Sequence, residues 1–154
     1  MVVDVLCVCR RPPAWVVETC ADYGKRLGRQ VELRFRYLNP GPDGADSAVR
    51  RRDEAQRLRK ALVAGTHLVT LDERGEEWTS VEFATRFSRW REHHPHLTLA
   101  VGGADGFDAD FLAGAAERWS LSRLTLPHLF VQVVVAEQLF RAASILAGHP
   151  YHRP

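Results

Sequence analysis

The sequence predicts an α/β fold in which a mostly parallel sheet carries helices on both faces. Short apolar runs rich in Val and Leu alternate with longer amphipathic segments along the 154 residues. This alternation is typical of βαβ units, because parallel strands need a crossover connection between them. No internal repeat, low-complexity stretch or linker interrupts the pattern, so we expect one domain over residues 1–154.

The first half of the chain predicts two strands and two helices. Val2 to Cys9 is a short, Val-rich run typical of a buried strand. Trp15 to Leu27 has apolar residues on one helical stripe, and VELRFRYL at 31–38 alternates as a strand with one polar face. The Pro, Gly and Asp content of NPGPDGAD at 39–46 indicates a loop before an Arg-rich helix at 47–64.

The second half predicts three more strands and three more helices. Thr79 and Glu82 form a capping box that begins one of these helices. Pro127 suits the first turn of the final helix, and Gly148 suits its end. The strands are expected at 67–72, 97–101 and 120–124, and the helices at 79–94, 108–119 and 127–147.

Composition and charge exclude several classes of protein. Hydrophobic residues make up 45% of the chain and charged residues 26%, which is ordinary for a globular protein. No apolar run approaches the roughly 20 residues of a membrane helix. The charges of MVVDVLCVCRRPP follow its apolar run, the reverse of a secretory signal. We therefore expect a cytoplasmic protein without a membrane partner.

The cysteines and histidines have structural explanations. An odd number of cysteines without a signal sequence argues against a disulfide framework. Cys7 and Cys9 lie two apart in a strand, so we expect buried free thiols on one face. The run HHPH at 93–96 is expected to be a solvated helix end. No thiol or carboxylate stands at a useful spacing from it, so no metal site is expected.

Three loops follow the predicted strands at the edge of the sheet where open α/β proteins bind ligands. The first begins at Asp72, and the second is GGADG at 102–106. The glycines allow a ligand to approach the backbone, although a tight connection would also explain them, and the pattern is not the dinucleotide fingerprint. The third loop, LSRLTLPH at 121–128, is unusually apolar, which suits either a flat heterocycle such as adenine or simple core packing.

The basic residues leave two interpretations open. The net charge is only +2, but 19 of the 21 basic residues are Arg, which binds phosphate well. A bias in genome composition would produce the same excess of Arg. Arg50 to Arg52, with Arg57, Arg59 and Lys60, form either a solvated helix face or a surface that meets RNA phosphates.

Four motifs resemble one known family. VTLDERGEEWTSVEFA, VGGADGF, WSLSRLTLPH and EQLFRAASILAGHPYHRP resemble the RlmH family, the ribosomal large-subunit pseudouridine N3-methyltransferases of the SPOUT class. The resemblance covers essentially the whole chain and is strongest from His67 onward. It implies a SPOUT fold with a C-terminal trefoil knot, S-adenosylmethionine as methyl donor, and a homodimer with the site near its interface. The implied substrate is a pseudouridine in a stem-loop of 23S rRNA in the assembled ribosome.

The resemblance also implies which residues act. Tyr151, His152 and Arg153 would lie by the target base, with His152 as general base, Tyr151 stacking on the base or hydrogen-bonding to it, and Arg153 holding phosphate. Glu137 and Arg141 would orient that tail. The cofactor pocket would be lined by Leu71, Gly102, Gly103, Leu121, Ser122, Arg123, Leu124, Thr125 and Leu126.

The sequence departs from the family pattern at three places. Gln132 stands where Arg is expected, Phe140 stands where Tyr is common, and the N-terminal CVCRRPPAW is unlike the usual start. The first two departures concern RNA contacts or dimer packing. Three alternatives stay open: a SPOUT methyltransferase with another RNA target, a non-catalytic RNA- or ribosome-binding protein of this fold, and a generic nucleotide-binding doubly wound domain.

Overall fold

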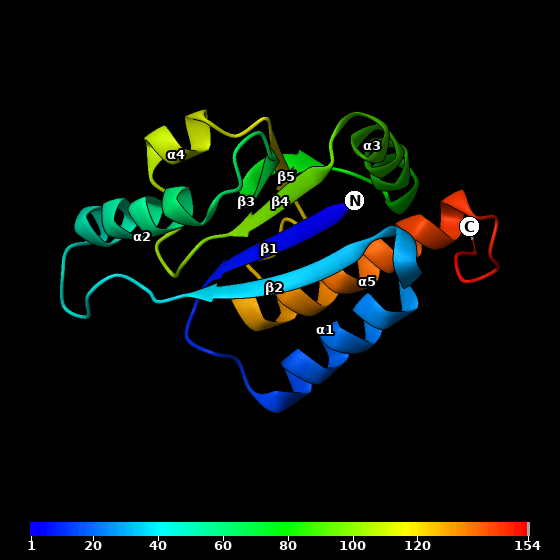
Figure 1. Ribbon diagram of the computed structural model, residues 1–154. Helices are drawn as coiled ribbons and strands as arrows, with labels where there is room; N and C mark the ends of the chain where they lie inside the picture. The colour runs from blue at the N-terminus through cyan, green and yellow to red at the C-terminus, as the bar shows by residue number, and fades with distance from the viewer. Residues whose placement is uncertain (154) are drawn as a thin grey trace.

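A computed structural model describes residues 1–153, and its strands form a sheet in the order β2-β1-β4-β3-β5 (Figure 1). All four pairings in this sheet are parallel, so the expected mostly parallel sheet is confirmed. The strands are β1 Val2–Val8, β2 Glu32–Leu38, β3 His67–Glu77, β4 His96–Val101 and β5 Glu117–Ser120.

Helices cover both faces of the sheet, as expected. One core joins the sheet to α1, α3 and α5, and a second core joins the other face to α2 and α4. Figure 1 shows α2 and α4 above the sheet and α1 and α5 below it. The helices are α1 Ala14–Arg26, α2 Ser47–Ala61, α3 Ser80–His93, α4 Ala109–Ala113 and α5 His128–Leu146, and a short 3-10 turn occupies Gly28–Gln30.

The segment before the final helix corrects the sequence prediction. The expected helix at 108–119 ends after five residues, where Gly114 caps α4. The fifth strand is therefore Glu117–Ser120 rather than 120–124, and Trp119 pairs with Leu71 of β3. The polar Glu117 and Arg118 resembled a helix surface in the sequence. In the fold they are strand residues whose partners lie far away in the chain.

The helix α5 also corrects an expectation. By length and composition its 19 residues could cross a membrane. It instead packs between α1 and α3 and buries Val135 and Leu139 against the sheet. It is therefore an apolar core helix.

A buried carboxylate on the sheet is paired with an arginine. Asp4 on β1 is 2% exposed. Its carboxylate accepts two hydrogen bonds, from Nε of Arg34 at 2.9 Å and from Nη2 at 3.0 Å. Cys7, Cys9 and Cys20 are free and buried, as expected, and burial raises the pKa of Cys20 to about 11.

Glu117 joins β5 to β3 and α3. Its carboxylate lies 2.9 Å from Nε2 of His67, and it accepts hydrogen bonds from Nε1 of Trp90 at 2.8 Å and from Arg86 at 2.7 Å. Burial raises the pKa of this carboxyl. The hydrogen bonds from His67 and Trp90, together with the Arg86 charge, outweigh burial and hold the pKa below its usual value. The ionised form is therefore stabilised by folding.

We expect Glu117→Gln to lower the free energy of unfolding by about 1–3 kcal/mol at neutral pH, because charge-assisted hydrogen bonds are lost. The stabilisation by Glu117 is complete above the unfolded pKa of Glu, about 4.3, and disappears as pH falls through the lower folded value. Urea unfolding at several pH values should give a shallower acid loss for the variant than for wild type. The exposed Glu18→Gln is the control, and identical acid profiles for Glu117→Gln and wild type would contradict the assignment.

Candidate functional site

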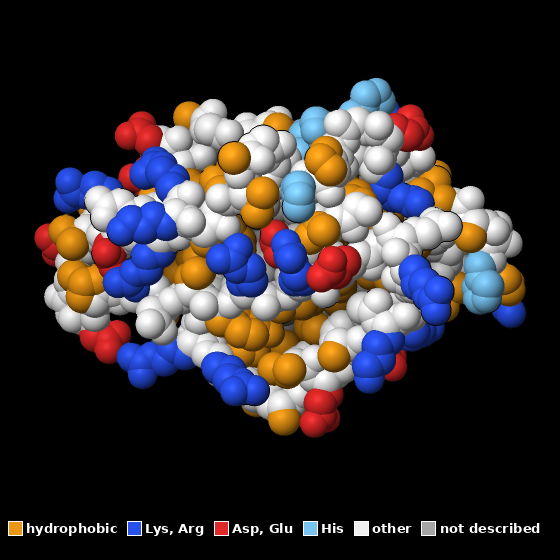
Figure 2. All heavy atoms as spheres, viewed as in Figure 1, with side chains coloured by type: hydrophobic (Ala, Val, Ile, Leu, Met, Phe, Trp, Pro, Cys, Tyr) orange, Lys and Arg blue, Asp and Glu red, His pale blue; other side chains and the backbone are white. Residues whose placement is uncertain are grey.

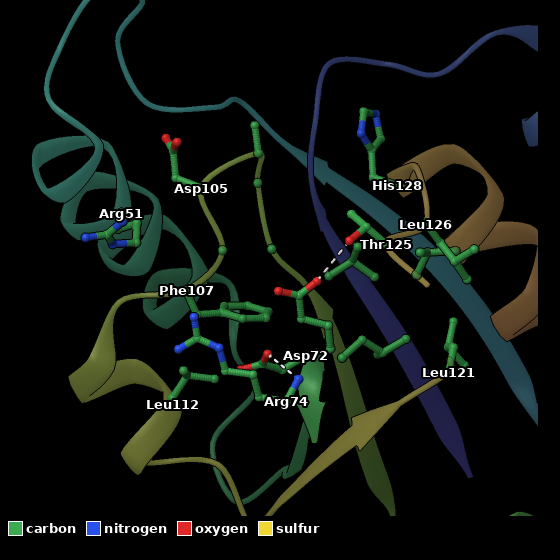
Figure 3. Close-up of a pocket in the computed structure, with 18 of the residues that line it drawn as sticks. Arg51, Asp72, Arg74, Asp105, Phe107, Leu112, Leu121, Thr125, Leu126 and His128 are labelled. Atoms are coloured by element: carbon green, nitrogen blue, oxygen red, sulfur yellow. Dashed lines mark hydrogen bonds between the residues drawn. The ribbon is translucent and has the colours of Figure 1, made fainter. Parts of the chain in front are cut away.

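A cavity of about 1020 Å³ lies beside residues 71–74 of β3 and at the carboxyl ends of β4 and β5 (Figure 3). All three segments that the sequence analysis predicted to bind a ligand line this cavity, because they meet at one edge of the sheet. Its lining also includes residues of α2 and α4 and the first residue of α5. The cavity is large enough for a ligand of cofactor size.

The first loop arises from a break in the pairing of β3 with β5. Leu71 and Glu76 both pair with Trp119, so residues 72–75 leave the ladder while the strand continues after them. The expected end of this strand at residue 72 was wrong, because β3 continues to Glu77. A Cβ on Gly75 would lie 2.8 Å from the carbonyl of Arg118, so glycine permits the close approach. As a result, residues 72–74 line the cavity.

The first and third loops are tied together across the cavity. Thr125 donates a hydrogen bond to Oε2 of Glu73 at 3.2 Å, which Figure 3 draws as a dashed line. Asp72 accepts a hydrogen bond at 3.0 Å from the backbone N–H of Arg74, also dashed in Figure 3. The bond between Thr125 and Glu73 joins segments that are 52 residues apart in the chain.

The glycine loop presses directly against α2. A Cβ on Gly103 would lie 2.7 Å from Oε2 of Glu54, which is 5% exposed. Oε1 of the same carboxylate accepts a hydrogen bond from the backbone N–H of Gly41 at 2.9 Å, so Glu54 cannot easily move away. Gly106 has a φ of +77°, which favours glycine at the turn.

The third loop supplies most of the apolar wall. Leu121 and Leu126 lie together on one side of the cavity, opposite Arg51 and Arg74 (Figure 3). Ser122 accepts a hydrogen bond from the backbone N–H of Leu124 at 3.0 Å, which shapes the turn.

Eight of the nine residues expected in a cofactor pocket line this cavity, and they are Leu71, Gly102, Gly103, Leu121, Ser122, Leu124, Thr125 and Leu126. The ninth is Arg123, whose side chain is 92% exposed and lies 3.4 Å from Glu77. A contribution from Arg123 to the cavity would therefore come from its backbone.

The C-terminal tail packs on the last turns of α5. Tyr151 donates a hydrogen bond to Glu137 at 3.0 Å, and its ring meets Phe140 edge-on at 4.7 Å between ring centres. Burial, with hydrogen bonds to Tyr23 and Glu137, raises the pKa of Tyr151 to about 12. The phenol is therefore protonated near neutral pH. Phe140, one departure from the family pattern, is the surface on which this ring rests.

Glu137 and Arg141 contact the tail, as the resemblance implied. Nε of Arg141 donates to Glu137 at 2.9 Å, and Nη1 of Arg141 lies 3.3 Å from Nδ1 of His152. Because guanidinium only donates, Nδ1 is the acceptor and a neutral His152 carries its proton on Nε2. Arg153 is exposed.

The structure does not bring the tail to the cavity within one chain. The cavity is lined by His128, at the start of α5, and the tail follows the other end of this helix. The 19 residues of α5 span roughly 28 Å at 1.5 Å per residue. Figure 1 shows the segment that follows α5 at the far end of this helix.

Sequence reasoning missed several residues of the cavity. Phe107 and Leu112 line it from the segment after the glycine loop, and Glu54 supports it from α2. These residues could not be predicted because the sequence does not show the order of the strands, and this order brings α2 and α4 to the same edge of the sheet. Gln132, another departure from the family pattern, is fully buried, and its side-chain N–H donates to Sγ of Cys9 at 3.5 Å. Its side chain is therefore not exposed to RNA or to a second copy of the chain.

The histidine run lies away from the cavity. His94 stacks on His67 with 4.5 Å between ring centres, and burial beside His67 and His93 lowers the pKa of His94. Within residues 1–153, no group of three or more His, Cys, Asp and Glu side chains is arranged to hold a metal ion.

Comparisons with known proteins match the whole region of the site. The family model described as "Predicted SPOUT methyltransferase" matches residues 1–152. A Ribosomal RNA large subunit methyltransferase H from Methylococcus capsulatus is 42% identical over 99% of this chain and 100% of its own length. Relatives of the same name from Dechloromonas aromatica and Xanthomonas campestris are 40% and 42% identical, covering 99% and 93% of this chain and of their own lengths.

We expect Gly103→Ala to lower the free energy of unfolding by about 1–3 kcal/mol, because the added methyl group collides with the fixed Glu54 carboxylate. Gly24→Ala is the matched control, since its Cβ would make ordinary contacts at 3.8 Å with Leu33 and the helix would lose a glycine. Urea unfolding of both variants checks this. Equal stability of Gly103→Ala and Gly24→Ala would show that the glycine loop tolerates a side chain.

Proposed function

Because this chain belongs to the SPOUT methyltransferase family, and its close relatives are the ribosomal RNA large subunit methyltransferases H, we propose that it methylates N3 of a pseudouridine in 23S rRNA. The chain is thus an rRNA methyltransferase, and residues 1–154 constitute its one SPOUT domain with the trefoil knot of that class. The observation that carries the proposal is the convergence of the three strand-end loops on one cavity with an apolar wall.

The residues of the cavity fit S-adenosylmethionine. The leucines Leu71, Leu121 and Leu126 offer an apolar surface for the adenine ring, and Gly102 and Gly103 contribute to the lining beside it. Ser122 to Thr125 would add backbone contacts. When bound, S-adenosylmethionine supplies an electrophilic methyl group on a sulfonium centre.

The residues of the tail bind the target base and accept its proton in this proposal. N3 of pseudouridine carries a proton that must leave as the N3–methyl bond forms, and His152 is positioned in this proposal to accept it. Since Arg141 faces Nδ1 and the neutral ring has its proton on Nε2, proton uptake requires the contact between Arg141 and His152 to open. Tyr151, protonated near neutral pH, binds the base, and Arg153 holds a phosphate.

The separation of tail and cavity supports a homodimer. A tail that lies roughly 28 Å from its own cavity along α5 cannot reach a base held there. A second copy can supply the tail, so that each site combines the cavity of one protomer with the tail of its partner. Trp15 of α1 and Phe130 of α5 are both exposed, with 5.7 Å between ring centres, and give the apolar surface that such an interface needs.

The substrate is the assembled ribosome in this proposal. The net charge of +2 is modest for an enzyme that would bind a bare RNA strand. Recognition by the shape of a folded site fits that charge better than recognition of a sequence. Work on the ribosome gives the protein a cytoplasmic location.

We expect purified wild-type protein to transfer labelled methyl groups from S-adenosylmethionine to ribosomes that contain the target pseudouridine. Ribosomes with uridine at the same position, and naked 23S rRNA fragments, should accept far less label. Mapping the modified nucleotide identifies the site. Equal labelling of uridine-containing ribosomes, or labelling of tRNA instead, would favour another target. Failure to bind S-adenosylmethionine in calorimetry would favour a non-catalytic RNA-binding protein.

We expect His152→Ala, and deletion of residues 151–154, to reduce methyl transfer by about 100-fold or more while cofactor binding is kept, because a positioned base contributes on the order of 10²–10⁴-fold. Gly103→Ala should weaken cofactor binding, because the added methyl group would push the glycine loop away from Glu54 and shift the lining of the cavity. Mixing Gly103→Ala with the deletion variant, followed by subunit exchange, should restore part of the activity in heterodimers. No restoration despite exchange would show that each chain uses its own tail, and a wild-type rate for His152→Ala would exclude it as base.

A further inference from the structure

We propose that Arg51, Arg52 and Arg74 form a phosphate-binding rim at the mouth of the cavity, which holds the rRNA backbone over the methyl donor. This inference rests on the proposed function and extends it to three arginines that were not among the expected site residues. It also answers which part of the Arg-rich helix α2 meets RNA. Figure 2 shows Lys and Arg side chains gathered over α2.

The arginines of α2 divide into two sets. Arg50 pairs with Asp105 at 2.6 Å, Arg57 with Asp53 at 2.7 Å and Arg59 with Asp108 at 3.5 Å. These three guanidinium groups are occupied by carboxylates, and Arg57 also donates to two backbone carbonyls. They therefore hold α2 to its neighbouring loops and have little charge to offer a partner.

Arg51 and Arg52 form the second set. Within residues 1–153 neither guanidinium makes an ion pair or hydrogen bond, and both side chains line the cavity. Arg52 is exposed and Arg51 is half-buried. The two charges are therefore unneutralised beside a site that is proposed to receive a polyanion.

Arg74 brings a third free charge to the same mouth. It belongs to the segment that leaves the ladder between β3 and β5, and its exposed side chain has no carboxylate partner within the described chain. In Figure 3, Arg74 and Arg51 lie on the same side of the cavity, across from Leu121 and Leu126.

The nearby carboxylates do not cancel this rim. Asp105 and Asp108 are held by Arg50 and Arg59. Asp72 accepts from the backbone N–H of Arg74, and Glu73 accepts from Thr125. None of these four acids is paired with the three rim guanidinium groups.

The arrangement favours a phosphate backbone over the carboxylate of the methyl donor. The donor has one carboxylate, whereas three arginines from two separate elements line the cavity. Guanidinium forks bind successive phosphates well, and exposed arginines on two elements can follow a chain of them. The apolar wall opposite is left for the adenine of the donor.

The test compares Arg51→Gln/Arg52→Gln/Arg74→Gln with wild type and with Arg89→Gln, an exposed arginine on α3 outside the cavity. Binding to unmethylated assembled ribosomes is measured over a salt series, methyl transfer over a series of ribosome concentrations, and S-adenosylmethionine binding by calorimetry. The triple variant should raise KM for ribosomes on the order of 10-fold, more than it lowers kcat. The plot of log affinity against log salt concentration has a negative slope, and the triple variant should make it shallower by roughly 0.7–0.9 for each lost phosphate contact.

Each outcome has one meaning. A further variant, Arg51→Lys/Arg52→Lys/Arg74→Lys, keeps the three charges. A KM and salt slope near wild type for this Lys variant, together with a wild-type salt slope for Arg89→Gln, support the rim. An unchanged KM and salt slope in the triple Gln variant overturns it. Weakened cofactor binding with unchanged ribosome affinity also overturns it and assigns the arginines to the donor carboxylate. Absence of methyl transfer by wild type would instead overturn the proposed function.

Discussion

The site depends on the close approach of Gly75 to the backbone of Arg118 and Trp119. This contact lets residues 72–75 leave the ladder while β3 and β5 resume pairing beyond them. Without the resumed pairing, the segment would be an unsupported loop. With the resumed pairing, the segment is held at both ends by β5, and Glu73 and Arg74 line the cavity. The bond from Thr125 to Glu73 then fixes the third loop to the first.

The two halves of the proposed chemistry have different structural supports. The cavity is built on strand ends, a glycine loop and the buried Glu54, all of which resist movement. The tail is held by a small set of polar and aromatic contacts around Glu137, Arg141 and Phe140. The rigid part suits a cofactor that must be held in one pose. The tail can adjust to a base that arrives on a large substrate.

Much of this fold could be read from the sequence because each signal was local. Apolar runs predicted β1 and β4, and the capping box at Thr79 predicted the start of α3, where both of its hydrogen bonds form. The interrupted β3 and the position of β5 could not be predicted, since both depend on pairing between distant residues. The cavity loops followed from the strand-end rule. The pairing of Arg50 and Arg59 on α2 could not be predicted, because their acidic partners Asp105 and Asp108 lie beyond β4.

The helix α5 has a consequence for how this protein can vary. Each residue added to an α-helix turns everything beyond it by about 100° and moves it by about 1.5 Å. An insertion before Glu137 would therefore rotate the tail and its partners Glu137 and Arg141 relative to the cavity, and would also disrupt the apolar face that packs on the sheet. A substitution along this helix, such as one at Gln132 or Phe140, leaves this spacing unchanged. The number of residues in α5 therefore sets the distance between the cavity and the tail.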